Sequence, residues 1–197
     1  NQAVCREACV TAGHAKRERG MFVKRVAIVL AWLLFVGGLT FAVIRFSGLL
    51  DSMLMADEPA DISLGPDIDL PQSPTYFLVC PPDACPSTDR NVPSPVFDAS
   101  PDTVATAFQA TAGAQGMKLV EWNGLALEFR FLARTPVFRF PDWVDVKVIP
   151  GENGGSRVFA YSRSVYGSDD FGQNEKRLKS WMAATVALIG RQAAPQN

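Results

Sequence analysis

Histidine is almost absent from this chain, and so are the catalytic motifs that depend on it. Among 197 residues the sole histidine is His14. The C-terminal part therefore lacks the commonest general base and metal ligand. It also has no G-x-S-x-G elbow, no H-E-x-x-H motif, no P-loop and no dinucleotide fingerprint. The sequence thus gives no sign of the common hydrolase, metalloprotease or nucleotide-binding classes, and it predicts no cofactor and no metal site.

Basic side chains are scarce after the first quarter of the chain. Residues 1–45 carry seven basic and two acidic residues, a net charge of +5, whereas residues 46–197 carry 12 basic and 18 acidic residues, a net charge of −6. Nucleic-acid-binding domains usually present a basic patch or stripe, and the acidic part has none. This balance argues against a nucleic-acid partner and against electrostatic docking of that part on anionic lipid.

The longest apolar run, Val26–Ile44, contains no charged residue. A helix needs about 20 apolar residues to cross a bilayer core, so this run is long enough. A secretory signal has an apolar stretch of only about 7–15 residues and a small-residue cleavage site, and no such site follows Ile44. We expect residues 21–50 to be a retained transmembrane signal anchor rather than a cleaved signal.

The charges that flank this run predict its orientation. Lys24 and Arg25 directly precede it, whereas after Arg45 the next basic residue is Arg90. The positive-inside rule then places the N-terminus in the cytoplasm and the C-terminal domain across the membrane. We therefore expect a single-pass protein of a bacterial inner membrane with a periplasmic domain.

Residues 1–20 are expected to be a disordered cytoplasmic stub or sequence upstream of the true start, because Met21 opens a compact signal anchor. Cys5 and Cys9 lie in this stretch with His14. A single C-x₃-C pair in a charged tail is weak support for a metal site, so none is predicted.

Residues 51–75 are rich in Asp, Pro and Ser, which is typical of a solvated acidic linker. Their aspartates do not match the spacing of a calcium loop. Beyond the linker, Cys80 and Cys85 flank a proline-rich turn. In an oxidising compartment a disulfide between them is the favoured interpretation, because redox-active pairs are usually C-x-x-C at a helix start.

Residues 76–190 are expected to form an α+β domain, followed by a flexible tail at 191–197. The residues at 98–102 read D-A-S-P-D, with Ser100 as N-cap and Pro101 at the first helical position. Strands are predicted at 117–122, 125–132, 144–148 and 157–166, with Asn123-Gly124 as a hairpin turn. A last helix runs from 170 to about 190, and its expected buried stripe comprises Phe171, Leu178, Trp181, Met182, Leu188 and Ile189.

This element order predicts a two-layer domain in which two helices flank a four-stranded antiparallel meander. A strongly curved sheet that grips a helix and leaves a cavity between them would also fit.

The stretch 162–177, SRSVYGSDDFGQNEKR, resembles the signature of the family catalogued as domain of unknown function 1499. That signature reads roughly S-R-S-R-x-G-x-S-D-L-G-x-N-x-x-R, with a tryptophan a few residues later. Residues 80–85 and 94–97 also resemble the family's first segment, so the similarity covers about 76–190. Val165 and Asp169 depart from the pattern. The family has no settled function, so the resemblance assigns the domain to a family but implies no mechanism. The residues that fit are Ser162, Arg163, Ser164, Gly167, Asp170, Gly172, Asn174 and Arg177, with Trp181 beyond them.

Four residues of this motif, Arg163, Asp170, Asn174 and Arg177, are the candidate ligand-binding residues. Three interpretations stay open. The motif is a strand-to-helix junction locked by hydrogen bonds, a polar site for an anionic or polar ligand such as a lipid headgroup or a glycan, or a catalytic site. Arg163 is expected to pair with Asp170 or Asp145.

The sequence predicts the function of this protein only in outline. We expect a non-enzymatic, membrane-anchored envelope domain that binds a partner protein or a small amphipathic or anionic ligand. The alternative is a carboxylate-dependent hydrolase that acts on an envelope substrate, and a pure scaffold is a third option. Asp142 and Asp145 are interpreted as solubilising residues of an edge strand and not as a catalytic pair. No catalytic residue is assigned.

Overall fold

The computed structural model describes residues 2–57 and 62–193, with side chains from residue 21 to residue 192 within these ranges. The chain divides into two compact units, Asn1–Leu50 and Asp51–Asn197. The expectations for Asn1, for the side chains of Cys5, Cys9 and His14, and for tail residues 194–197 fall outside what is described. The boundaries drawn for the stub, linker and tail stay predictions.

The first unit is dominated by helix α1, Gln2–Phe46. Its segment Met21–Phe46 has 26 residues and a mean hydropathy of 2.5, and it contains the run Val26–Ile44. At 1.5 Å per residue, such a segment is about 39 Å long, which exceeds a hydrocarbon core of about 30 Å. This segment is therefore long and apolar enough to cross a membrane, and it supports membrane association. The short helix α2, Leu49–Met53, follows.

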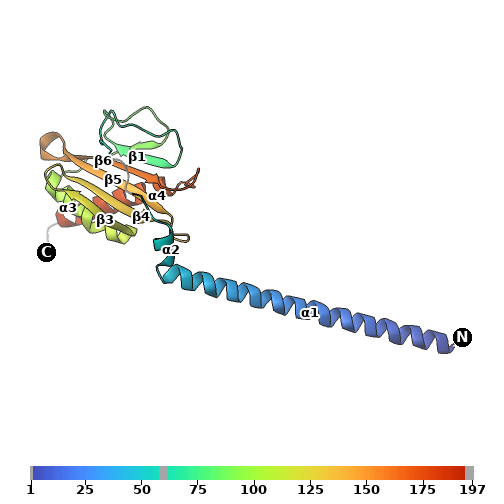
Figure 1. The fold of residues 1–197 in the computed structure, drawn as a ribbon. Coiled ribbons are helices and arrows are strands. Elements are labelled where there is room, and N and C mark those ends of the chain that lie inside the picture. The colour runs from blue at the N-terminus through green and yellow to red at the C-terminus, as the bar shows by residue number, and fades with distance from the viewer. Residues whose placement is uncertain (1, 58–61, 194–197) are drawn as a thin grey trace. The chain divides into compact units, whose positions relative to one another are not determined.

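The second unit is built on a six-stranded sheet in the order β2-β1-β6-β5-β4-β3. Helices α3 and α4 lie together on one face of this sheet (Figure 1). The strands are β1 Tyr76–Cys80, β2 Asn91–Pro93, β3 Met117–Asn123, β4 Glu128–Arg134, β5 Pro141–Pro150 and β6 Ser156–Ser164. The helices are α3 Pro101–Ala112 and α4 Gln173–Ala193, with single 3₁₀ turns at Gly113–Gln115 and Glu152–Gly154.

The α+β fold class is confirmed, but the sheet has six strands rather than four. Strands β3 to β6 form the expected antiparallel meander. Strand β1 extends it by pairing antiparallel with β6 and parallel with β2. The sequence YFLVC at 76–80 does not reveal β1, because a short strand buried on both faces lacks the alternation that marks a half-buried strand.

The hairpin turn between β3 and β4 is longer than Asn123-Gly124 predicts. Strand β4 begins at Glu128, and Leu127 has a positive φ of 50°. Leu125 is fully exposed, so it does not share the buried face of Phe129 as the alternation predicts. A four-residue turn therefore replaces the expected two-residue turn.

The helix-side core is centred on Trp181 of α4. Its ring makes edge-on contacts with Phe108 of α3 at 5.0 Å and Phe131 of β4 at 5.1 Å between ring centroids. Its indole Nε1 donates to the Thr111 hydroxyl at 3.0 Å. Ser100 caps α3 as expected. Trp181 thus joins both helices to the meander.

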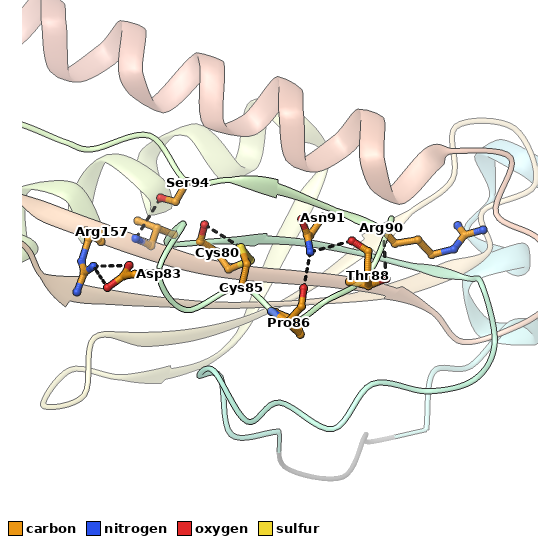
Figure 2. The surroundings of a disulfide bond; sticks show 10 residues. Cys80, Asp83, Cys85, Pro86, Thr88, Arg90, Asn91, Ser94 and Arg157 are labelled. Atoms are coloured by element: carbon orange, nitrogen blue, oxygen red, sulfur yellow. Dashed lines mark hydrogen bonds and ion pairs between the residues drawn. A yellow bond between two sulfur atoms is a disulfide. The ribbon is translucent and has the colours of Figure 1, made fainter.

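The opposite face of the sheet is covered by loops. Leu64 and Ile68 are buried there with Leu78, Tyr161 and other residues of β1 and β6. The loop that follows β1 also lies on this face, away from the helix drawn above the sheet in Figure 2. The segment expected to be a linker therefore contributes apolar side chains to a second, smaller core.

Cys80, the last residue of β1, and Cys85 in this loop lie at disulfide distance, with Cα atoms 5.3 Å apart, within the usual range. The Arg157 guanidinium donates to the Asp83 carboxylate at 2.7 Å inside the same loop (Figure 2). This hydrogen bond holds the pKa of Asp83 below its usual value. The pair and the disulfide together fix the loop onto the sheet.

We predict that Trp181→Ala destabilises the domain by about 3–5 kcal/mol, because it removes a fully buried aromatic side chain and leaves a cavity. Pulse proteolysis of the detergent-solubilised full-length protein across a urea series would measure this loss. The matched control is Val186→Ala, an exposed position on the same helix, which should change stability by less than about 0.5 kcal/mol. Equal effects of both changes would contradict the assigned core.

Candidate functional site

Two neighbouring aspartates hold the junction between β6 and α4. Asp170 accepts hydrogen bonds from the backbone N–H groups of Gly172 at 3.0 Å and Asn174 at 2.9 Å. These groups are among the unpaired donors at the start of a helix, so Asp170 acts as a cap. Asp169 accepts from the backbone N–H of Phe171 at 2.8 Å. Both carboxylates thus fix the backbone of the junction.

Asn174 is the centre of a buried polar cluster. Its Oδ1 accepts from the Ser162 hydroxyl at 2.6 Å and from Arg177 Nη1 at 2.7 Å. Its Nδ2 donates to the Thr75 carbonyl at 3.0 Å and to the Ser164 hydroxyl at 3.2 Å. Because Asn174 has no solvent exposure, these four bonds replace the water that its carboxamide loses on folding. One side chain thereby joins α4 to β6 and to the residue before β1.

Arg177 extends this cluster to β5. Its Nη2 forms an ion pair with Asp142, and the two side chains are only 9% and 2% exposed. The interpretation of Asp142 as an edge-strand solubilising residue is therefore wrong. Strand β5 lies between β4 and β6 and is not an edge strand, and Asp142 is buried in it. A buried carboxylate is stable only beside a positive charge and hydrogen-bond donors, and the Arg177 guanidinium provides both.

Arg163 lies on the other face of the sheet, because successive residues of a strand point to opposite sides. Its Nη2 is 3.9 Å from Asp145 Oδ2, and its guanidinium lies over the Tyr161 ring at 5.6 Å. Asp145, which is 5% exposed, also accepts from Arg130 Nε at 2.7 Å. The expected pairing of Arg163 with Asp145 is found, whereas the edge-strand interpretation of Asp145 is wrong.

The structure thus brings three of the four candidate residues together and separates the fourth. Asp170, Asn174 and Arg177 share the helix-side junction. Arg163 belongs to a row of alternating charges on the opposite face, which runs from Glu121 through Arg130 and Asp145. A cavity of about 450 Å³ lies over part of this row, between strands β3–β5 and residues 62–64.

Tyr161 is a buried titratable group on the same face. It is fully buried, and this burial raises its pKa to about 12. Its hydroxyl has no hydrogen-bond partner among the described residues. The neutral phenol is therefore the form that this face stabilises.

The chain enters the second unit at one end of the sheet, which we call the N-proximal end. Asp51 accepts from Arg139 Nε at 2.8 Å and Nη2 at 2.6 Å, and this contact raises the pKa of Arg139. Arg134, the last residue of β4, donates to the backbone carbonyls of Asp51 at 3.1 Å and Leu54 at 2.9 Å. The Tyr166 hydroxyl donates to the Met55 carbonyl. Residues 51–55 are therefore bound to the loops at this end.

An apolar cavity of about 610 Å³ opens at the N-proximal end. The loop between β4 and β5 forms one wall, and the junction between β6 and α4 forms the other. Its polar lining includes the buried Asp142, together with Ser164, Asp170 and Gln173. Five large side chains at its mouth are exposed to solvent, and we call them the apolar rim: Val137, Phe138, Phe140, Tyr166 and Phe171.

The apolar rim is absent from the sequence-based predictions. The residues between Pro136 and Pro141 read V-F-R-F. Three large apolar residues in a loop of four are unusual, and this density was the available signal. Phe171 is assigned to the buried stripe of α4, which is wrong: it is 87% exposed, whereas Leu178, Trp181 and Met182 are buried as expected.

A family model described as Protein of unknown function (DUF1499) matches residues 68–185. This range contains all six strands, helix α3 and most of α4, so it covers both walls of the apolar cavity. No curated protein matches the chain.

Asn174→Ala should destabilise the domain by about 2–4 kcal/mol, because it removes four buried hydrogen bonds and takes away the acceptor of the Ser162 hydroxyl proton. Urea unfolding monitored by pulse proteolysis would measure the change. Lys176→Ala, an exposed change on the same helix, is the control and should be close to neutral. A neutral Asn174→Ala variant would show that the cluster is not structural.

A second prediction concerns Tyr161 and alkaline pH. Because the pKa is raised from about 10 to about 12, the folded protein keeps a proton that the unfolded chain loses. Stability should therefore be fully present below pH 10 and should fall as the pH rises toward 12. Tyr161→Phe should remove this part of the pH dependence. Ultraviolet absorbance of tyrosinate would be measured in parallel. It should show one tyrosine that ionises at higher pH than the others in wild type and is missing in Tyr161→Phe.

Proposed function

The chain belongs to this family of proteins of unknown function, and we propose from its apolar cavity that the domain is a membrane-tethered binding module for an amphipathic molecule. The observation that carries the proposal is the combination of an apolar wall and a polar floor in one cavity. Sites for small ligands typically measure 300–1,000 Å³ and are mostly apolar, with a few polar groups that fix orientation. The cavity at the N-proximal end, at about 610 Å³, fits that description.

The charge of the lining narrows the chemistry of the ligand. Among the described residues that line the cavity, Asp142, Asp169 and Asp170 are acidic and none is basic. Because Arg177 compensates Asp142, the negative charge of the lining comes from Asp169 and Asp170, which attract hydrogen-bond donors and cations and repel an anion. The ligand that fits best therefore has an apolar chain and a hydroxyl or ammonium group, and an anionic headgroup fits less well.

The motif residues take separate roles in this proposal. Asp170 lies in the lining and contacts the polar part of the ligand. Asn174 and Arg177 are positioning residues, because they hold Asp142 and the junction without lining the cavity. Arg163 lies on the opposite face and takes no part in this site.

The location of the protein forms part of the same proposal. The flanking charges Lys24 and Arg25 favour a cytoplasmic N-terminus. The Cys80–Cys85 pair is consistent with an oxidising compartment for the domain. These observations support a single-pass protein of a bacterial inner membrane whose domain lies in the periplasm.

Photocrosslinking would test the proposed site. Full-length protein in phosphatidylcholine nanodiscs would be exposed to a long-chain amine that carries a diazirine close to its amino group. We expect saturable adducts on peptides that contain the cavity residues Ser164 and Gln173, and weaker labelling by the fatty acid of equal length. Gln173→Trp, which places an indole in the cavity, should lower amine labelling about tenfold, equivalent to about 1.4 kcal/mol.

Lys176→Trp is the matched control, because it adds the same ring one turn along α4 at an exposed position outside the lining. It should leave labelling unchanged. Equal labelling of both tryptophan variants would show that the cavity is not the site. Stronger labelling by the fatty acid would contradict the assigned polarity of the floor.

A further inference from the structure

The side chain of Phe171 contributes little to the packing of the domain. The residue has a positive φ of 51°, a left-handed conformation that is a genuine outlier for a bulky residue and that asparagine or glycine adopts far more readily. Its ring gains little from folding, because the side chain is 87% exposed. Backbone strain of this kind concentrates at functional sites. Strain and exposure together indicate that the Phe171 ring contacts another molecule.

The rest of the apolar rim shares this exposure. Val137, Phe138 and Phe140 project from a loop in which Arg139 also has a positive φ, of 62°. Tyr166 and Phe171 lie across the cavity mouth on the opposite wall. Contiguous exposed apolar patches on soluble domains usually mark surfaces that bind a protein or a membrane.

Chain connectivity favours the membrane as the partner. Arg134, which precedes the rim loop, and Arg139, which lies within it, both bind Asp51. Asp51 follows Phe46, the last residue of the apolar segment, by only five positions. Even a fully extended chain spans at most about 3.6 Å per residue, so Asp51 cannot lie more than about 18 Å from Phe46. A segment that spans a bilayer therefore keeps the N-proximal end of the domain close to that bilayer.

We propose that the apolar rim docks onto the surface of the bilayer in which the chain is anchored. Aromatic and aliphatic rim residues enter the interfacial layer, where aromatic side chains are commonly enriched. The contact rests on apolar burial and not on charge, in agreement with the net negative charge of residues 46–197. The helix already holds the domain at the membrane, so the rim is at high effective concentration beside the lipid. A weak apolar contact is therefore sufficient for docking.

Docking would turn the mouth of the apolar cavity toward lipid. An amphipathic molecule could then pass between the bilayer and the cavity without crossing water. The docking inference stands on the rim and the tether alone, so it holds whether or not the cavity is occupied. Its failure is therefore distinguishable from failure of the proposed binding function.

The experiment places an environment-sensitive fluorophore on the rim. In a Cys5→Ser, Cys9→Ser background, Phe171→Cys would be labelled with nitrobenzoxadiazole in full-length protein. The protein would be reconstituted in nanodiscs of phosphatidylcholine and phosphatidylglycerol, with either ordinary or brominated acyl chains. The control label is at Leu125→Cys, a fully exposed apolar position at the opposite end of β4 from the rim loop. Pulse proteolysis would show that each labelled protein is folded.

We expect blue-shifted emission at position 171 and strong quenching by brominated lipid, with neither effect at position 125. Adding Phe140→Ser should reduce the quenching several-fold. Emission at 171 that matches position 125 would overturn the proposal. A blue shift without quenching by brominated lipid would also overturn it, because the label would then be covered by protein, such as a second copy of this chain.

A second variant separates docking from folding. Phe171→Asn suits the left-handed backbone, so the urea midpoint should be unchanged or higher. With the label moved to Val137→Cys, Phe171→Asn should weaken quenching by brominated lipid. Unchanged quenching at position 137 would contradict a role for Phe171 in docking. Loss of quenching with intact amine crosslinking at Ser164 would support docking as a contact separate from ligand binding.

Discussion

The hydrogen bonds of Asn174 are the constraint on which the geometry of the domain depends. Strand β6, helix α4 and the residue before β1 meet at this one side chain, and Arg177 connects it to Asp142 of β5. A buried carboxamide tolerates little displacement, because each lost bond leaves a desolvated polar atom. The cluster therefore sets the angle at which α4 leaves the sheet. That angle determines the position of the junction between β6 and α4, which forms one wall of the apolar cavity.

Much of this arrangement can be predicted from sequence, and the exceptions have physical causes. Periodicity finds the meander and α3, because apolar residues recur at strand or helix spacing in most of these segments. It does not find β1, which is covered on both faces, or the packed segment around Leu64 and Ile68, where apolar residues are dispersed among prolines and aspartates. Local pattern carries no information about which long-range partner will cover a strand.

The candidate site shows the same limit more sharply. The motif identified Asn174 and Arg177 as neighbours on one helix face, and they do act together. It could not place Arg163 apart from them, since the face of a strand residue depends on the register of the whole sheet. Nor could it show that Asp142 is buried, because Asp142 precedes the predicted strand 144–148 and its ion-pair partner, Arg177, comes from α4. Phe171 was misassigned because helical spacing was extended into a junction whose backbone is left-handed.

The engagement of the carboxylates favours binding over hydrolysis as the role of this site. A general base must be able to take up a proton, and an acid must be able to release one. Asp170 uses both oxygens on the backbone N–H groups of Gly172 and Asn174, and Asp142 is paired with the guanidinium of Arg177. Protonating either carboxylate would break the contacts that hold the junction, so catalysis there would oppose the fold. A binding role makes no such demand: the same fixed negative charges can orient a hydroxyl or ammonium group while the apolar wall holds its chain.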